Sequence, residues 1–142
     1  MKIGLVIVDH GSRRSESNRL LETVAERFAD RFAHRHPIVE PAHMELAEPT
    51  IATAYARCAA RGADTIVVVP FFLGPGKHWN QDIPRLAAEA AEQWPNTQFR
   101  VAAVLGCDDL LVQLLEQRAR ECIDSDPELI AARAAASAAP AR

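Results

Sequence analysis

The chain contains only three cysteines, none of them in a CxxC pair, and it has no long apolar run. The missing CxxC pair argues against a zinc ribbon or a dithiol redox motif, and an odd cysteine count without a disulfide framework fits a reducing cytoplasm. Cys58, Cys107 and Cys122 are expected to be small apolar residues, buried or half-buried. No segment approaches the roughly 20 apolar residues of a membrane span, and the short N-terminal run lacks a secretory cleavage site. We therefore expect a cytoplasmic protein with no membrane partner.

The sequence also lacks an excess of positive charge. It holds 16 Lys and Arg against 19 Asp and Glu, which gives a formal net charge of -3. This balance argues against a general nucleic-acid binder, which needs a basic surface to meet the phosphate backbone. The length of 142 residues suits one domain with a real core, and the hydrophobic fraction of 49% is typical of globular proteins.

Apolar, β-branched runs alternate with amphipathic segments along the chain. Strands are predicted at residues 2–8, 38–44, 64–70 and 98–104. Four helices are predicted between and after these strands. Ser15 or Ser17 caps the first, and Pro49 lies in the first turn of the second. Asp82 caps the third, with Pro84 in its first turn, and Asp108 or Asp109 caps the fourth. The alternation predicts an α/β fold, a three-layer sandwich around a four-stranded parallel sheet. Pro41 favours an edge position for the second strand, consistent with the strand order 2-1-3-4.

The segment FFLGPGKHWNQDIP, residues 71–84, is the most informative stretch of the chain. It follows the third strand, and a loop of this length at a strand end suggests that it holds something. It carries His78, and His10 ends the first strand in a similar way, while Glu45 follows the second strand and Asp108 the fourth. Ligands of open parallel sheets bind beyond the carboxyl strand ends, near the point where strand order reverses. The sequence therefore predicts a metal or acid/base site around His10 and His78.

These residues also have purely structural interpretations. His10 is equally well explained as a turn residue that hydrogen-bonds the backbone, Glu45 as a loop carboxylate, and His43 as a hydrogen-bonded strand residue. His10 and His78 lie far apart in the sequence and match no metal-binding motif. We expect them to converge because both follow neighbouring parallel strands, and not because their spacing in the sequence matches a metal-binding motif.

Basic residues near the same edge favour an anionic ligand. Arg13 and Arg14 precede a predicted helix N-terminus, whose free N–H groups also attract anions, and Lys77 adjoins His78. We predict that these three side chains bind ligand carboxylates, with solvated charges as the alternative. Three aromatic residues of the long segment either pack it against the body or form an apolar wall for a flat ligand: Phe71, Phe72 and Trp79.

The composition shifts near Asp124. Residues 124–142 are alanine-rich and short of large apolar side chains, so this tail is expected to be partly helical or disordered. We therefore divide the chain into a domain at residues 1–123 and a C-terminal tail at residues 124–142.

The stretches DHGSRR, HMELAEPTI and FFLGPGKHWNQDIP occur in that order. Together they resemble the small class II chelatases that act on sirohydrochlorin, the single-domain cobaltochelatase and ferrochelatase group. The resemblance covers roughly residues 2 to 120 and is closest to the form found in siroheme synthesis of plants and cyanobacteria. It implies a flavodoxin-like, chelatase-like half-domain that pairs as a homodimer to complete a cleft for the tetrapyrrole.

The resemblance also implies site residues. A divalent metal substrate, Fe²⁺ or Co²⁺ and also Ni²⁺, would be held by His10 and His78, with an acidic residue near Glu45. The chain departs from the family where many relatives carry a histidine after the fourth strand, since it has Cys107 there. Plant forms carry a C-terminal cysteine cluster for an iron–sulfur centre, and this tail has no cysteine beyond Cys122, so no cluster is predicted.

Metal insertion into a tetrapyrrole removes two pyrrole protons and strips water from the metal. Neutral imidazoles bind Fe²⁺, Co²⁺ and Ni²⁺ alike, and two protein ligands hold an ion loosely enough to release it. His10, His78 or Glu45 is predicted to accept the protons, since imidazole titrates near neutral pH. Two alternatives remain: a non-catalytic metal or tetrapyrrole carrier, and a histidine-phosphatase-like hydrolase, although Asp9 stands where such hydrolases usually have arginine.

Overall fold

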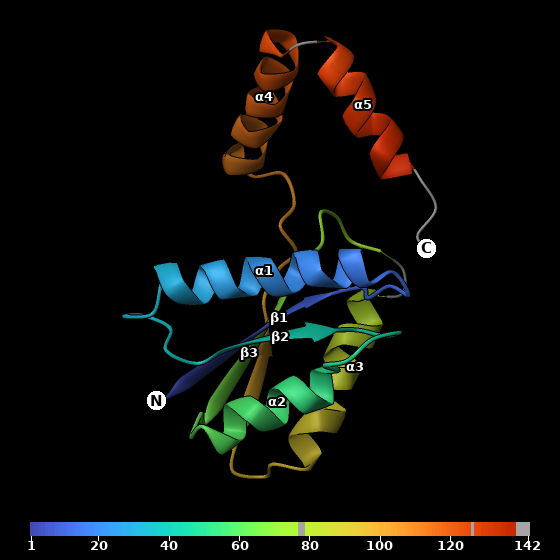
Figure 1. The fold of residues 1–142 in the computed structure, drawn as a ribbon. Helices are drawn as coiled ribbons and strands as arrows, with labels where there is room; N and C mark the ends of the chain where they lie inside the picture. Colours follow the sequence, from blue (N-terminus) through green and yellow to red (C-terminus); the bar gives the residue numbers. More distant parts are fainter. Residues whose placement is uncertain (77–78, 126, 139–142) are drawn as a thin grey trace. The chain divides into compact units, whose positions relative to one another are not determined.

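The computed structural model describes residues 1–76, 79–125 and 127–138. In chain order the elements are β1 (Ile3–Asp9), α1 (Ser15–Arg31), β2 (Val39–His43), α2 (Ile51–Ala60), β3 (Thr65–Pro70), α3 (Trp79–Glu92), β4 (Gln98–Val101), α4 (Asp109–Asp124) and α5 (Pro127–Ala138). The strands form one parallel sheet in the order β2-β1-β3-β4 (Figure 1). The predicted α/β class, the strand order and the edge position of the strand with Pro41 are therefore confirmed.

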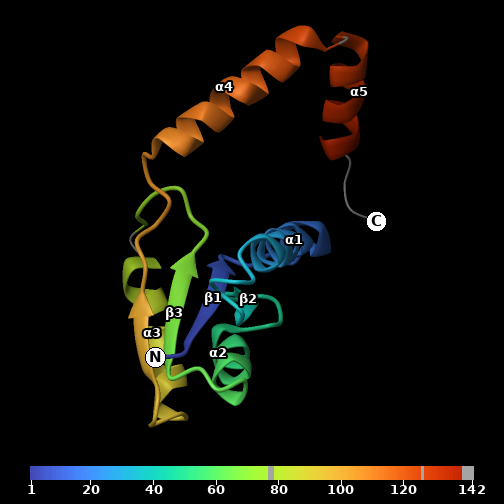
Figure 2. The ribbon, with the colours of Figure 1, turned by 90° about the vertical axis from the view of Figure 1, so that its left-hand side faces the viewer.

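Helices cover both faces of the sheet. Figure 1 shows α1 on one side of the strands, with α2 and α3 on the other, and Figure 2 shows the arrows of β1 and β3 side by side and pointing the same way. The alternation of side chains along β1 matches this arrangement, because successive residues of a strand point to opposite faces. Ile7 packs with Leu21 and Ala25 of α1, whereas Val6 and Val8 belong to the larger apolar cluster under α2 and α3.

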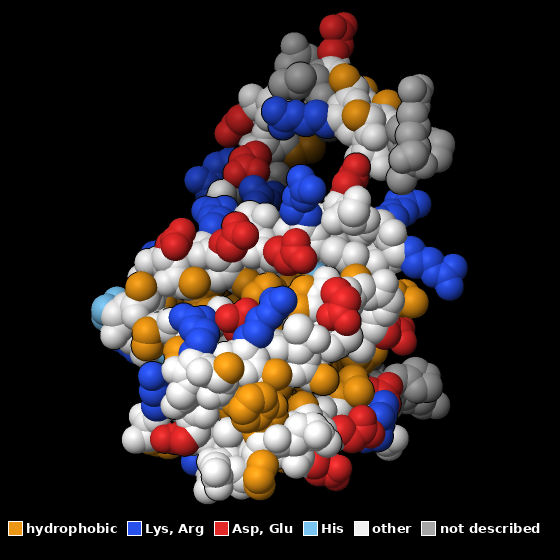
Figure 3. Space-filling model, turned by 60° about the horizontal axis from the view of Figure 1, so that its bottom comes forward, with side chains coloured by type: hydrophobic (Ala, Val, Ile, Leu, Met, Phe, Trp, Pro, Cys, Tyr) orange, Lys and Arg blue, Asp and Glu red, His pale blue; other side chains and the backbone are white. Residues whose placement is uncertain are grey.

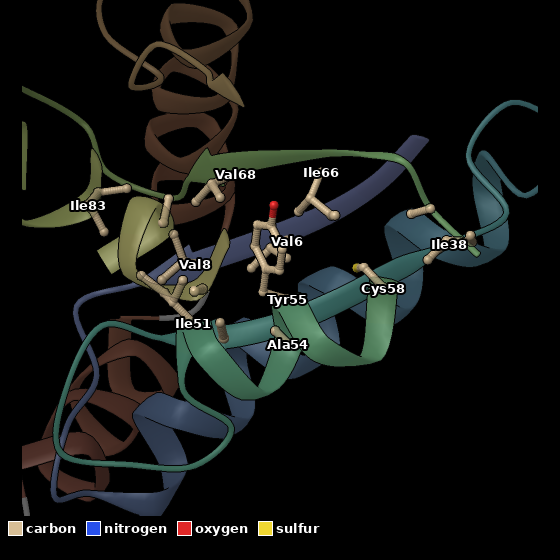
Figure 4. Packing of buried hydrophobic residues seen from close by; sticks show 14 of the residues in the cluster. Val6, Val8, Ile38, Ile51, Ala54, Tyr55, Cys58, Ile66, Val68 and Ile83 are labelled. Carbon is tan, nitrogen blue, oxygen red and sulfur yellow. The ribbon is translucent and has the colours of Figure 1, made fainter. Parts of the chain in front are cut away.

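The larger cluster forms the main core. Its buried side chains come from the strands and from α2 and α3, as Figure 4 shows for Val68, Tyr55 and Ile83. Tyr55 is fully buried, and its hydroxyl satisfies its hydrogen-bonding need with Thr97 Oγ1 at 2.8 Å. Burying an aromatic side chain of this size stabilises the fold by about 2 kcal/mol. The core thus fixes the central strands whose carboxyl ends carry the predicted site.

Several predicted helix starts are wrong in detail. The N-cap of α1 is Arg14, without a side-chain cap, so neither Ser15 nor Ser17 caps this helix. Thr50 caps α2 by accepting a hydrogen bond from the Thr53 N–H, which places Pro49 ahead of the helix. The start of α3 at Trp79 precedes the expected cap at Asp82 and leaves Pro84 inside the helix. Asp108 does cap α4, as predicted, by accepting from the Leu110 N–H at 2.9 Å.

The chain divides into two compact units, Met1–Gly106 and Cys107–Arg142. The first unit contains the whole sheet with α1, α2 and α3; the second contains α4 and α5. The boundary predicted between residues 123 and 124 stays a prediction. No helix among the described residues is long and apolar enough to cross a membrane.

The three cysteines have different environments. Cys58 is fully buried, and burial raises the pKa of its thiol to about 12, so it serves as a small apolar core residue as predicted. The same expectation is wrong for Cys107 and Cys122, which are exposed. Basic and acidic side chains are intermixed over the molecular face in Figure 3, in keeping with the small net charge.

Hydrogen bonds tie the chain together at the amino edge of the sheet. The Lys2 backbone N–H donates to the Asp64 carboxylate at 3.0 Å, and Lys2 Nζ donates to the Arg61 carbonyl oxygen at 2.9 Å. Arg61 in turn pairs with Glu40 at 3.1 Å and donates to the Pro37 carbonyl oxygen at 2.8 Å. This network links the starts of β1, β2 and β3.

Asp64 is expected to make stability depend on pH. The hydrogen bond from Lys2 lowers the pKa of Asp64 below its ordinary value of 3.8. Since the pKa is lower in the folded state, the bond stabilises the fold above the unfolded pKa, and this contribution is lost as pH falls through the folded pKa. Urea midpoints measured from about pH 5 down to about pH 2.5 should fall less steeply for Asp64→Asn than for the unmodified chain. Asp30→Asn, on the exposed side of α1, is the control, and an unchanged slope in Asp64→Asn would refute the assignment.

Candidate metal-binding site

The ends of β1 and β2 are joined by backbone hydrogen bonds. Asp9 pairs with His43 in the parallel register, the Met44 N–H donates to the Asp9 carbonyl oxygen at 2.9 Å, and the Glu45 N–H donates to the His10 carbonyl oxygen at 3.1 Å. This junction brings His10 Nε2 within 3.5 Å of Glu45 Oε1. The predicted convergence of His10 and Glu45 is therefore present in the structure.

His10 and Glu45 form a half-exposed pair. Their side chains are 50% and 53% exposed, so molecules from solution have access to them. His10 Nδ1 lies 3.3 Å from the Gly11 carbonyl oxygen. In the tautomer that donates this hydrogen bond, Nε2 keeps its lone pair and faces the Glu45 carboxylate. An imidazole nitrogen beside a carboxylate oxygen is a donor set that suits a divalent first-row metal, and the carboxylate is also a base.

Gly11 allows the two strand ends to approach this closely. Its φ is +88°, a conformation that L residues with a side chain rarely adopt. A Cβ atom at this position would lie 1.9 Å from the Glu45 carbonyl oxygen, much closer than van der Waals contact. The glycine of the DHGS stretch is thus required by the backbone packing of the site.

A side chain from α1 holds the loop after β1. Asn18 Oδ1 accepts from the Ser12 N–H at 2.9 Å, and Asn18 Nδ2 donates to the Ser12 carbonyl oxygen at 2.7 Å. Ser12 Oγ also accepts from the Arg14 N–H at 3.0 Å. Arg13 and Arg14 therefore sit on an ordered turn, with exposed side chains at the N-terminus of α1. This placement agrees with the predicted anion-binding role without testing it.

His78 and Lys77 lie outside the described residues. The described part of this segment begins after β3, which ends at Pro70, and α3 begins at Trp79. The predicted pairing of His10 with His78 stays a prediction. Among the described residues, no group of three or more His, Cys, Asp or Glu side chains is arranged to hold a metal.

Phe71 and Phe72 of this segment pack in different ways, whereas the side chain of Trp79 lies outside the described part of the structure. Phe71 contacts the apolar cluster on the α1 face, and Phe72 is buried in the main core. Phe72 also lines an apolar hollow of about 290 Å³ at the ends of β3 and β4, together with Pro70, Ile83 and Val104. Packing explains Phe71, whereas Phe72 both packs and provides an apolar wall.

The partners of His43 and the role of Asn18 were missed from the sequence. His43 is fully buried, with Nδ1 2.6 Å from Asp9 Oδ1 and Nε2 3.6 Å from Glu22 Oε1. The sequence interpretation of His43 as a hydrogen-bonded strand residue is confirmed, but it named neither partner. Asn18 was also missed, although its place in the first turn of an expected helix was a signal.

These features define a class: a parallel α/β protein with a histidine and a carboxylate paired at the carboxyl edge of its sheet. The family follows from sequence comparison. The CbiX family model matches residues 4–122, and the chain belongs to this family. The family membership leaves the histidine-phosphatase-like alternative without support.

Relatives of known name are similar over most of the chain. The chloroplastic sirohydrochlorin ferrochelatase of Arabidopsis thaliana is 46% identical over 134 residues, which cover 91% of this chain and 59% of that protein. The sirohydrochlorin cobaltochelatase of Sulfolobus acidocaldarius is 34% identical over 121 residues, covering 85% of this chain and 93% of that protein.

Solved structures agree with these similarities. SirB from Bacillus subtilis with Fe³⁺ superposes with a TM-score of 0.79 at 28% identity, covering 89% of this chain and 49% of that one. A sirohydrochlorin chelatase SirB from a Bacillus subtilis subspecies, solved in complex with cobalt, gives a TM-score of 0.72 at 31% identity, covering 91% of this chain and 57% of that one. The chain thus spans about half the length of these two structures.

Proposed function

We propose that the protein is a sirohydrochlorin chelatase, a lyase that inserts Fe²⁺ or Co²⁺ into a tetrapyrrole of siroheme or cobalamin biosynthesis. The observation that carries the proposal is the pair of His10 and Glu45, 3.5 Å apart and half exposed at the carboxyl edge of the sheet. Relatives that are named for this activity with iron and with cobalt support it. In this proposal the metal is a substrate of the reaction and not a resident cofactor.

His10 and His78 present the metal in this mechanism. Two imidazole ligands leave most of the coordination sphere to water and then to the pyrrole nitrogens, so the ion can be transferred. Glu45 beside His10 is placed either to complete the metal site or to accept a pyrrole proton. The half exposure of both side chains supports this role, since a large flat ring needs an open edge to approach.

Arg13, Arg14 and Lys77 bind the carboxylates of the substrate in this proposal. Support comes from the two arginines, which are exposed on the ordered turn that leads from His10 into α1. A guanidinium group pairs with a carboxylate in two parallel hydrogen bonds, and the free N–H groups at the start of α1 add to the attraction. The substituents of the ring would therefore orient it over His10.

The active unit that we propose is a homodimer. The chain spans 49% of the solved Bacillus SirB chain and 59% of the Arabidopsis enzyme. Two copies of the chain together would therefore come closer to the full length of those proteins. Within its own unit, α4 leaves Leu110, Leu115 and Ile123 largely exposed, and a second copy is suited to cover them. We assign the activity to residues 1–123, with residues 124–142 as a tail. Cytoplasmic localisation is retained as a prediction from the unpaired cysteines.

The test is an absorbance time course. The purified full chain is mixed anaerobically with sirohydrochlorin and Co²⁺ or Fe²⁺, and spectra are compared with a protein-free mixture. A chelatase converts the spectrum to the metallated form with time, at a rate proportional to protein concentration. A static spectral shift would instead show a carrier, and a rate equal to the protein-free mixture would overturn the proposal.

A further inference from the structure

His43 is the one fully buried histidine among the described residues, and the proposed reaction does not use it. It is the last residue of β2 and has no exposed surface. Its Nδ1 lies 2.6 Å from Asp9 Oδ1, whereas its Nε2 lies 3.6 Å from Glu22 Oε1 and has no hydrogen-bond partner among the described residues. Burying an imidazole nitrogen without a hydrogen-bond partner destabilises the folded state, so the presence of a histidine at this position needs an explanation.

The neighbours of His43 suggest an explanation. Asp9, which accepts its hydrogen bond, directly precedes His10, and Glu45 follows His43 by two positions. A Cβ atom at Gly11 would lie 3.2 Å from His43 Cβ, so the histidine packs directly behind the turn that carries His10. The His43 side chain therefore packs at its Cβ against the loop after β1, and its backbone leads through Met44 into Glu45.

The backbone holds the other side of the same junction. The His43 N–H donates to the Pro49 carbonyl oxygen at 2.8 Å, and the next two N–H groups donate to Asp9 and His10. The His43–Asp9 hydrogen bond adds a side-chain link across these strand ends. A hydrogen bond from a buried N–H to a carboxylate is among the stronger ones in proteins and is directional.

We propose that His43 is a positioning residue, which holds Asp9 and thereby keeps His10 and Glu45 at the spacing that the metal requires. This inference rests on the proposed chelatase function. His43 does not touch the ion or the ring in this view; it acts through the carboxylate next to His10. Loss of such an outer partner of a metal ligand typically costs about 10- to 100-fold in metal affinity or activity.

The test compares three replacements of His43. Asparagine carries an N–H donor close to the place of Nδ1, so His43→Asn should keep the bond to Asp9 and most of the activity. Leucine fills much of the volume without a donor, and glutamine carries its amide further out, nearer to Nε2. We expect His43→Leu and His43→Gln to lower kcat and to weaken Co²⁺ binding, each by about tenfold or more, with KM for sirohydrochlorin unchanged.

Two further measurements separate positioning from general stability. All rates are taken well below the melting temperature of each variant, and Co²⁺ affinity is measured by calorimetry without the tetrapyrrole. In a His10→Ala background, His43→Gln should cause a much smaller further loss of Co²⁺ affinity than in the unmodified chain, because its effect passes through the spacing of His10 and Glu45. If His43→Leu does not fold, the comparison of asparagine with glutamine stands alone.

The outcomes are distinguishable. Unchanged kcat and Co²⁺ affinity in His43→Leu or His43→Gln would overturn the positioning role. Equal losses in the asparagine and glutamine variants, in parallel with their melting temperatures, would also overturn it by showing a packing role only. If the unmodified chain binds Co²⁺ but does not metallate sirohydrochlorin, the proposed function fails, while the Co²⁺ affinities still decide whether His43 positions His10.

Discussion

Replacing His10 with alanine is expected to lower the rate of sirohydrochlorin metallation by about 100-fold or more. His10 is the described side chain that combines a free imidazole nitrogen, half exposure and a carboxylate at 3.5 Å. In the proposed mechanism its removal takes away a metal ligand and leaves Glu45 without its imidazole neighbour. The loss should appear in kcat and in Co²⁺ affinity, measured by the absorbance time course and by calorimetry, while the melting temperature changes little because the side chain is exposed.

His34→Ala is the matched control, since His34 is an exposed histidine just after α1 and belongs to no predicted site. It should leave rate and metal affinity unchanged. Glu45→Gln then distinguishes the two roles of the carboxylate. Weaker Co²⁺ binding would identify a ligand, whereas a lower kcat with unchanged Co²⁺ binding would identify a proton acceptor. Full activity in His10→Ala would contradict the metal-site assignment.

Gly11→Ala is expected to damage both the fold and the site. The new Cβ would lie 1.9 Å from the Glu45 carbonyl oxygen, and this neighbour is backbone, which cannot rotate away. The ends of β1 and β2 must separate to admit the methyl group, which breaks the hydrogen bond from the Glu45 N–H to His10. We expect a loss of about 3 kcal/mol or more in the free energy of unfolding, measured in urea, together with a rate close to that of His10→Ala.

Gly62→Ala separates the cost of a left-handed backbone from the cost of the clash with the Glu45 carbonyl oxygen. Gly62 has a φ of +91°, nearly that of Gly11, but its Cβ would meet only the flexible end of Lys2 at 3.1 Å. It should therefore show the cost of the left-handed backbone together with a small shift of Lys2 Nζ, about 1 to 2 kcal/mol, with chelation retained. A Gly11→Ala variant no less stable than Gly62→Ala would show that the strand ends separate easily, against the close packing described above.

The parallel α/β class was predictable because the sequence alternates between apolar runs and amphipathic segments. Strand β1 shows this well, since buried residues Gly4 to Val8 form an unbroken apolar run. Helix starts were harder to predict, because several residues near each start have the chemistry of a cap. Ser15 was such a candidate, yet Arg14 occupies the N-cap position because the preceding turn is already fixed by Ser12 and Asn18.

The site was predictable to the level of strand ends and no further. Fold logic brings the carboxyl ends of β1 and β2 together, and this was enough to associate His10 with Glu45. The sequence carries no sign that Asp9 and Glu22 flank His43, because these contacts depend on the strand register and on how α1 lies over the sheet. The role of Arg13 and Arg14 likewise depends on the ligand that they bind, and neither the sequence nor the fold identifies that ligand.

The backbone link between the strand ends has a consequence for turnover. Because peptide hydrogen bonds set the separation of His10 and Glu45, the entropy of organising this pair is lost when the chain folds and not when the ion arrives. The metal-free and metal-loaded forms should then share one geometry at this junction. In the proposed reaction the ion is released in every cycle, and this preformed geometry helps because release needs no rearrangement of β1 and β2.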